Sequence, residues 1–167
     1  MKLYKTFVIK IQRFISYYKL KLARLPASTY AISSGFACGS MVSFTPLLGL
    51  HFVLAIIFAY LIRGNIVAAL LGTFVGNPIT FPFIWGLIYN LGAKITSSSN
   101  TTLNPDLSFD LIFNQTLEIF IPMLIGGLIL ALPIWLITYL ITYSFVSSYK
   151  KSKQIKASKK NKGHKIE

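Results

Sequence analysis

The polar residues best able to do chemistry in this chain stand inside apolar segments, and the densest group lies between residues 72 and 82. An asparagine and two threonines are interleaved there with glycines and prolines. Proline breaks helices, and a broken helix leaves backbone donors and acceptors that need partners in an apolar setting. Broken helices of this kind line binding sites in transporters. We therefore take Thr73, Asn77 and Thr80 as candidate substrate-binding residues, and Gly72, Gly76, Pro78 and Pro82 as structural turn residues.

Another break of the same kind lies earlier in the chain and is called the first break below, the one within residues 72–82 being the second. Thr45 and Pro46 are followed by Gly49 and then by His51. We take Thr45 and His51 as candidate binding residues, and Pro46 and Gly49 as structural turn residues. A lone histidine in such a place is more often a satisfied buried or interfacial residue than a proton relay, and both interpretations stay open.

Arg63 is the only Lys or Arg between Arg24 and Lys94. Gly64 and Asn65 follow it and begin the next apolar block. A helix N-terminus offers unpaired N–H groups, and an arginine adds a planar fork that suits a phosphate. Arg63 and Asn65 therefore predict an anion site. The alternative is that Arg63 extends to water at a membrane surface.

The chain offers little for catalysis. No Asp or Glu precedes Asp106, and the few carboxylates after it show no pairing. The single cysteine, Cys38, stands between Ala37 and Gly39 as a small packing residue would. We therefore predict a protein that is not an enzyme, with no catalytic residue, no metal and no cofactor.

Composition and charge favour a membrane protein. Hydrophobic residues make up 54% of the 167 residues and charged residues only 13%, against about 25% in an ordinary soluble domain. Seven of the 17 Lys and Arg lie in residues 1–24 and eight lie in 150–165, so both clusters flank apolar blocks, as the positive-inside rule describes for cytoplasmic segments. We interpret the net charge of +13 as topology and attraction to anionic lipid headgroups, and not as nucleic-acid binding.

The order of segments predicts an all-α membrane protein with one membrane domain, residues 26–149. Residues 1–25 repeat apolar side chains at helical spacing between basic ones, which predicts a basic amphipathic helix in the membrane interface, the alternative being a helix packed on a soluble partner. Three apolar blocks follow, each too long for one upright helix and short for two. The remaining predicted segments are two proline-broken hairpins, re-entrant or bent (31–62 and 66–93), a polar linker (94–116), one long transmembrane helix (117–147), for which a third hairpin is the alternative, and a disordered Lys-rich tail (150–167).

Three signatures taken together resemble a bacterial family. Ser43-Phe44-Thr45-Pro46 with Gly49-Leu50-His51, then residues 61–65, then residues 72–82, are similar to successive signatures of domain-of-unknown-function family 2062. The resemblance covers about residues 26–95 and continues less closely to Tyr149. It implies an inner-membrane protein of bacteria, sometimes joined in one chain to glycosyltransferases, whose biochemical role is not established.

Two functions are therefore expected. The first is binding or translocation of an anionic lipid or lipid-linked envelope precursor. The alternative is a non-transporting scaffold for a cell-envelope glycosyltransferase or a similar enzyme. The expected partners are membrane lipids, an envelope-synthesis enzyme and a second copy of the chain, and the expected location is the bacterial inner membrane with both termini cytoplasmic.

Overall fold

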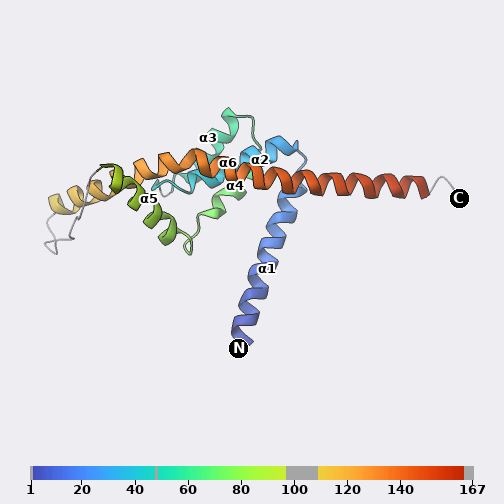
Figure 1. The fold of residues 1–167 in the computed structure, drawn as a ribbon, viewed down its shortest axis with the longest axis horizontal. Coiled ribbons are helices and arrows are strands. Elements are labelled where there is room, and N and C mark those ends of the chain that lie inside the picture. Colours follow the sequence, from blue (N-terminus) through green and yellow to red (C-terminus); the bar gives the residue numbers. More distant parts are fainter. Residues whose placement is uncertain (1, 48, 97–108, 164–167) are drawn as a thin grey trace.

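The computed structural model describes residues 2–47, 49–96 and 109–163, and these ranges contain helices and no strand. The predicted all-α class is confirmed. Figure 1 shows one helix, α6, as the long axis of the molecule, with the other helices gathered along part of it. The helices are α1 (Lys2–Ala23), α2 (Thr29–Val42), α3 (His51–Leu61), α4 (Ile66–Gly72), α5 (Phe81–Thr96) and α6 (Phe109–Gly163), and a short 3-10 turn, η1 (Thr73–Val75), continues α4.

Helix α2 lies at the centre and packs against α3, α4 and α6. Glycines let it approach α4 closely: a Cβ at Gly35 would strike the main chain of Asn65, and a Cβ at Gly39 would strike that of Ala69. One turn along α2 moves the contact one turn along α4 in the same direction, so the two helices run parallel. Close approach through small residues gives the dense packing that holds helices together in apolar surroundings.

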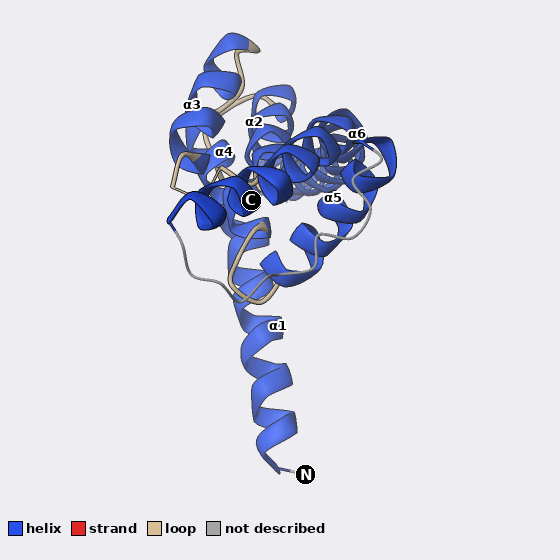
Figure 2. Ribbon diagram, turned by 90° about the vertical axis from the view of Figure 1, so that its left-hand side faces the viewer, coloured by secondary structure: helices blue, strands red, loops and turns tan. Residues whose placement is uncertain are grey.

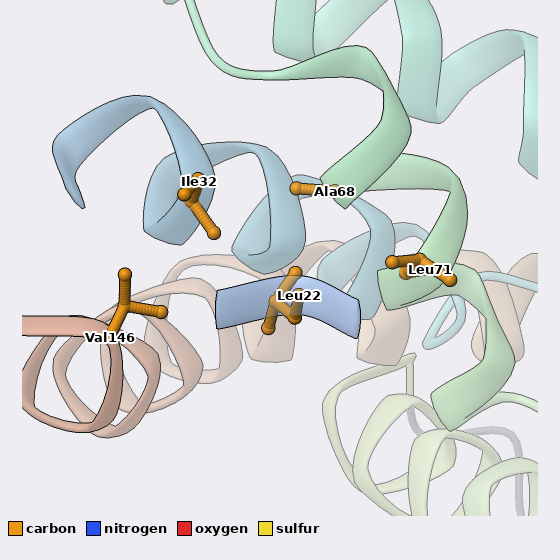
Figure 3. Packing of buried hydrophobic residues seen from close by; sticks show 5 residues of the cluster. All are labelled: Leu22, Ile32, Ala68, Leu71 and Val146. Carbon is orange, nitrogen blue, oxygen red and sulfur yellow. The ribbon is translucent and has the colours of Figure 1, made fainter. Parts of the chain in front are cut away.

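The apolar residues beside this contact join four helices. Figure 3 shows them converging from α1, α2, α4 and α6. The cluster consists of Leu22, Ile32, Ala68, Leu71 and Val146, all of them buried.

A second close contact joins α5 to α6. A Cβ at Gly92 would strike the carbonyl of Pro122, and a Cβ at Gly126 would strike that of Ile88. The contact moves forward on α6 as it moves backward on α5, so these two helices are antiparallel. The adjacent Gly127 lies against the carbonyl of Phe44, the second residue after α2.

The chain reverses between α2 and α3. At one end the His51 ring lies against the carbonyl of Thr45, and at the other the Tyr30 hydroxyl donates to the carbonyl of Ile62 at 3.1 Å. The two helices are therefore antiparallel neighbours. In the second block the helices take different partners, α4 packing on α2 and α5 on α6.

Helix α6 is longer than the sequence predicted. It contains the predicted transmembrane segment, continues through Pro122 and Pro133, and runs on to Gly163. The prediction of a disordered tail from Lys150 is thus contradicted as far as Gly163. Adding a residue to an existing helix needs no new nucleation, and lysine is a good helix former. The segment Leu117–Ser158 is long and apolar enough to cross a membrane.

Helix α1 leaves the other helices and runs across the direction of α6 (Figures 1 and 2). Its predicted apolar stripe reaches the core through the buried Leu22, with Tyr18 and Leu25 partly buried beside it. The helical spacing also predicts four earlier residues on this stripe, whose side chains lie outside those the structure describes: Leu3, Phe7, Ile11 and Phe14.

The C-terminal end of α1 is tied to α6 by polar contacts. Arg24 Nε donates to the Tyr149 hydroxyl at 3.4 Å. Lys150 Nζ donates to the carbonyl of Ala27, just beyond α1. These contacts fix the base of α1 beside the basic end of α6.

Candidate functional site

The first break lies between α2 and α3, and hydrogen bonds of Thr45 and His51 hold its backbone. Thr45 is buried, and its hydroxyl donates to the carbonyl of Val42 at 2.8 Å. His51 is also buried, and its Nε2 lies 3.3 Å from the carbonyl of Thr45. A carbonyl only accepts, so Nε2 carries the hydrogen in this bond. Gly49 takes a positive φ of 86°, which glycine adopts without steric cost.

The second break is organised by Asn77 and Thr80. Asn77 Oδ1 accepts from the N–H groups of Ile79 and Thr80 at 2.9 and 3.1 Å. The Thr80 hydroxyl accepts from the N–H of Asn77 at 2.9 Å and donates to the carbonyl of Val75 at 2.7 Å. These bonds satisfy the backbone on both sides of Pro78. The predicted turn residue Pro82 stands in the first turn of α5, where a missing N–H leaves no intrahelical bond unmade.

Thr73 belongs to the packing between the breaks. Its side chain is buried, and its hydroxyl donates to the carbonyl of Leu70 at 2.7 Å. Gly72 precedes it and lets α4 contact α2, because a Cβ there would strike the carbonyl of Phe36. Four of the candidate binding residues thus form side-chain hydrogen bonds to the protein's own backbone: Thr45, Thr73, Asn77 and Thr80.

The two breaks meet in space. Ser43 Oγ donates to the carbonyl of Thr73 at 3.1 Å, and a Cβ at Gly76 would come within 2.8 Å of Ser43 Cβ. The His51 and Phe81 rings lie beside each other, with centroids 6.0 Å apart. The structure therefore brings together five of the seven candidate binding residues, from the two breaks: Thr45, His51, Thr73, Asn77 and Thr80.

The other two candidates, Arg63 and Asn65, lie at the far end of α3. That helix is 11 residues long, so Arg63 is separated from the His51 end by about 16 Å of helix. Asn65 caps α4, its Oδ1 accepting from the N–H of Ala68 at 2.8 Å. From the sequence we expected this helix start to offer free N–H groups beside Arg63. One of these groups, the N–H of Ala68, already donates to the Asn65 side chain.

Arg63 itself ends α3. Its N–H donates to the carbonyl of Tyr60 at 3.1 Å, and the N–H of Gly64 donates to that of Ala59 at 2.7 Å, the bond pair of a Schellman motif. The position requires a positive φ, and Arg63 adopts 55°. Glycine is usual there, because the left-handed conformation costs other residues about 1–2 kcal/mol. The arginine side chain is exposed and has no hydrogen-bond or ionic partner among the described residues.

A row of aromatic residues begins at the end of α3 that carries Arg63 and continues along α6. Tyr30, whose hydroxyl bonds Ile62, lies against Tyr139 with ring centroids 6.3 Å apart. Trp135 and Tyr143 extend this group along α6, on either side of Tyr139. Tyrosine and tryptophan at such positions are typical of the boundary between hydrocarbon and water.

Sequence reasoning missed Ser43, Phe81 and Tyr30. Ser43 and Phe81 lie inside the family signatures, which marked their segments but gave no reason to choose a serine or a phenylalanine. Tyr30 had no signal at all, because its partners Ile62 and Tyr139 are distant in sequence. Within the described residues, no three His, Cys, Asp or Glu side chains lie together as metal ligands would.

In the described residues, the fold and the two breaks define a class of protein: a helical chain in which two breaks between helices meet beside one helix that is long and apolar enough to span a membrane. A family model described as "Uncharacterized protein conserved in bacteria (DUF2062)" matches residues 12–154. The chain belongs to this family, and the match extends further toward both ends than the signatures suggested. No curated protein and no solved structure matches the chain.

Proposed function

We propose that this protein resides in the bacterial inner membrane and binds the phosphate of an anionic lipid through Arg63. The membrane assignment rests first on α6, whose apolar part begins at Leu117. Gly127, which contacts the first break, lies about 15 Å farther along at ~1.5 Å per residue. The breaks then lie within the hydrocarbon, where their internal hydrogen bonds are needed.

Helix lengths support a topology. At ~1.5 Å per residue, α2 and α3 are about 21 and 16 Å long, shorter than the ~30 Å hydrocarbon core, and they are antiparallel. This supports a re-entrant first hairpin that enters and leaves on one side. The second block then crosses once, as α4, break and α5, and α6 returns. Both termini face the cytoplasm, as their basic charge favours.

This topology puts α1 at the cytoplasmic surface. The helix runs across α6 and is tied to it at Tyr149 and Lys150, where the basic end of α6 begins. An amphipathic helix in that position lies in the membrane interface, its lysines near anionic headgroups.

The observation that carries the lipid proposal is the conformation of Arg63. A strained, exposed position that favours glycine holds the only arginine between Arg24 and Lys94, and the preceding residue, Ile62, accepts a hydrogen bond from Tyr30. A guanidinium fork there suits a lipid phosphate at the interface. Thr45, His51, Thr73, Asn77 and Thr80 then build the breaks and do not touch the ligand. If the lipid is translocated, the breaks are where the membrane helices would bend.

Native mass spectrometry of the purified protein with added phosphatidylglycerol tests this proposal. We expect Arg63→Gln to reduce lipid retention without preventing membrane insertion, and Arg63→Lys to recover part of it, because ammonium cannot make the paired contact. Lys94→Gln is the matched control, an exposed basic residue near the other end of the membrane domain. If Arg63 only extends to water, Lys would substitute fully, and Arg63→Gln would change thermal stability and leave lipid retention as it is.

The scaffold alternative has one observation in its favour. The hydroxyl and amide groups of the breaks are occupied by the protein's own backbone, as expected if the breaks serve packing alone. Stoichiometric co-purification of an envelope-synthesis enzyme, with no retained lipid, would favour that function.

A further inference from the structure

A groove lies in the angle between α1 and the α4–η1 segment. It has a volume of about 330 Å³, at the lower end of the ~300–1,000 Å³ typical of ligand pockets. Tyr18 and Phe74 lie against each other across it, with ring centroids 5.5 Å apart. Its lining is apolar and aromatic apart from one lysine: Tyr18, Lys19 and Leu22 of α1, Phe36 of α2, and Leu71, Phe74 and Val75.

The charge beside this groove has one sign. Lys19 is exposed, and Arg24 and Lys150 lie close to the base of α1. Among the side chains that the structure describes, Glu118 is the acidic one, and it stands near the opposite end of α6. An apolar groove with a basic rim and no nearby carboxylate in the described chain is complementary to an amphiphile with an anionic head and an apolar tail.

We propose that this groove holds one hydrocarbon chain of an anionic phospholipid, with the lipid headgroup at Lys19. This proposal rests on the proposed function, that the protein binds an anionic lipid. It adds the groove and Lys19 as a lipid contact separate from Arg63. The tail selects a lipid over free phosphate, since only a lipid fills the apolar part.

The groove also has a link to the second break. Phe74 and Val75 form part of its wall, and both are bonded to the turn: Asn77 Nδ2 donates to the carbonyl of Phe74 at 3.4 Å, and the Thr80 hydroxyl to that of Val75. A hydrocarbon chain of a lipid in the groove would therefore contact the backbone that Asn77 and Thr80 hold in place. Binding of the lipid chain would restrain the second break.

The test compares two variants with two matched controls. Lys19→Gln removes the rim charge, and Lys21→Gln makes the same change two residues away, where Lys21 lies over the Tyr17 ring. Val75→Trp fills the groove, and Ile79→Trp introduces the same side chain at an exposed residue of the same break. The measurement is native mass spectrometry of full-length protein with phosphatidylglycerol, phosphatidylcholine or glycerol phosphate, with thermal unfolding in parallel.

We expect Lys19→Gln to weaken phosphatidylglycerol binding about fivefold, the effect of one basic residue near an anionic surface, with no change for Lys21→Gln. Val75→Trp should weaken binding of both phospholipids, and glycerol phosphate should not compete. Equal lipid binding by Lys19→Gln and Lys21→Gln, or competition by glycerol phosphate, would overturn the proposal.

Two outcomes separate this inference from the proposed function. Lipid retention that depends on Arg63 but on neither groove variant overturns the groove and leaves the proposed function standing. A wild-type protein that retains no anionic lipid overturns both. If Val75→Trp does not fold, Lys19→Gln still decides, because its side chain is exposed. A groove that is covered by a second copy, shown by a dimer that Val75→Trp dissociates, also overturns the proposal.

Discussion

The hydroxyl of Ser43 donates a 3.1 Å hydrogen bond to the main-chain carbonyl of Thr73, and this bond joins the two breaks. The same hydroxyl lies 3.1 Å from the carbonyl of Gly39 on its own helix. One small side chain thus serves the end of α2 and the end of α4 together. The parallel arrangement of α2 and α4 makes this possible, because it brings their C-terminal ends to the same place.

Removing that hydroxyl should weaken the contact between the breaks. Ser43→Ala leaves the Thr73 carbonyl without this donor, and we expect the free energy of unfolding to fall by about 1–2 kcal/mol. Thermal unfolding in detergent measures the change. Ser148→Ala, at an exposed serine of α6, should leave the melting temperature unchanged; equal effects would contradict a special role for Ser43.

Asn77 should be required for the second break to form. Asn77→Leu keeps the approximate size of the side chain but removes the acceptor for the Ile79 and Thr80 N–H groups. We expect a loss of about 1–3 kcal/mol in stability, the usual result of leaving a polar group without a partner in apolar surroundings. Asn90→Leu is the control, since Asn90 is exposed on α5. If neither variant lowers stability, the second break does not depend on the Asn77 side chain and the prediction is wrong.

The contact between α5 and α6 should tolerate no side chain at Gly92. A Cβ there meets the Pro122 main chain, so Gly92→Ala must push the helices apart and lower stability. Gly86→Ala is a close control on the same helix, because nothing lies within 4 Å of the added carbon. At that open site alanine should be neutral or stabilising by up to about 1 kcal/mol. Unfolding temperatures in detergent compare the two, and the prediction is wrong if their order is reversed.

Arg63→Gly should separate stability from binding. Glycine adopts the left-handed conformation freely, so we expect a gain of about 1 kcal/mol in the free energy of unfolding. The same change removes the guanidinium and should reduce retention of phosphatidylglycerol. A variant that loses stability and binding together would instead mean that the arginine side chain holds the fold.

Topology can be tested with single cysteines in a Cys38→Ala background. Cys38 is the chain's single cysteine and is buried. Cysteines at Lys5 and Lys160 should be shielded from an impermeant thiol reagent in intact cells, whereas one at Ser98 should be labelled. Labelling at either terminus would reverse the proposed orientation.

Local features of this fold could be predicted from the sequence. The order Gly-Asn-Pro-Ile-Thr predicts a turn. The side chains of Asn77 and Thr80 do form hydrogen bonds with backbone groups a few residues away. Asn65 as a helix start follows from the same local chemistry. The close approach of Gly126 to another helix was also predictable from a small residue in an apolar segment.

Long-range relationships could not be predicted. Nothing local shows that Ser43 reaches Thr73, because the bond depends on α2 and α4 being parallel. From the sequence we predicted that Arg63 precedes the start of a helix. In the structure it also forms the end of the preceding helix, α3. Nothing in the sequence indicated this end, because an arginine stands where a glycine is usual. The helical tail was missed because a run of lysines without apolar periodicity is typical of disorder, whereas here it continues a helix that already exists.

The contact between Phe44 and Gly127 has a consequence for biogenesis. The two residues are 83 positions apart in the chain, and at ~5–20 residues per second the ribosome needs about 4–17 s to make the segment between them. During that interval α2, with its buried serines, has been synthesised, but α6, against which it packs, has not. We expect a nascent chain that ends before α6 to be a better substrate for membrane proteases or insertion factors than the complete protein.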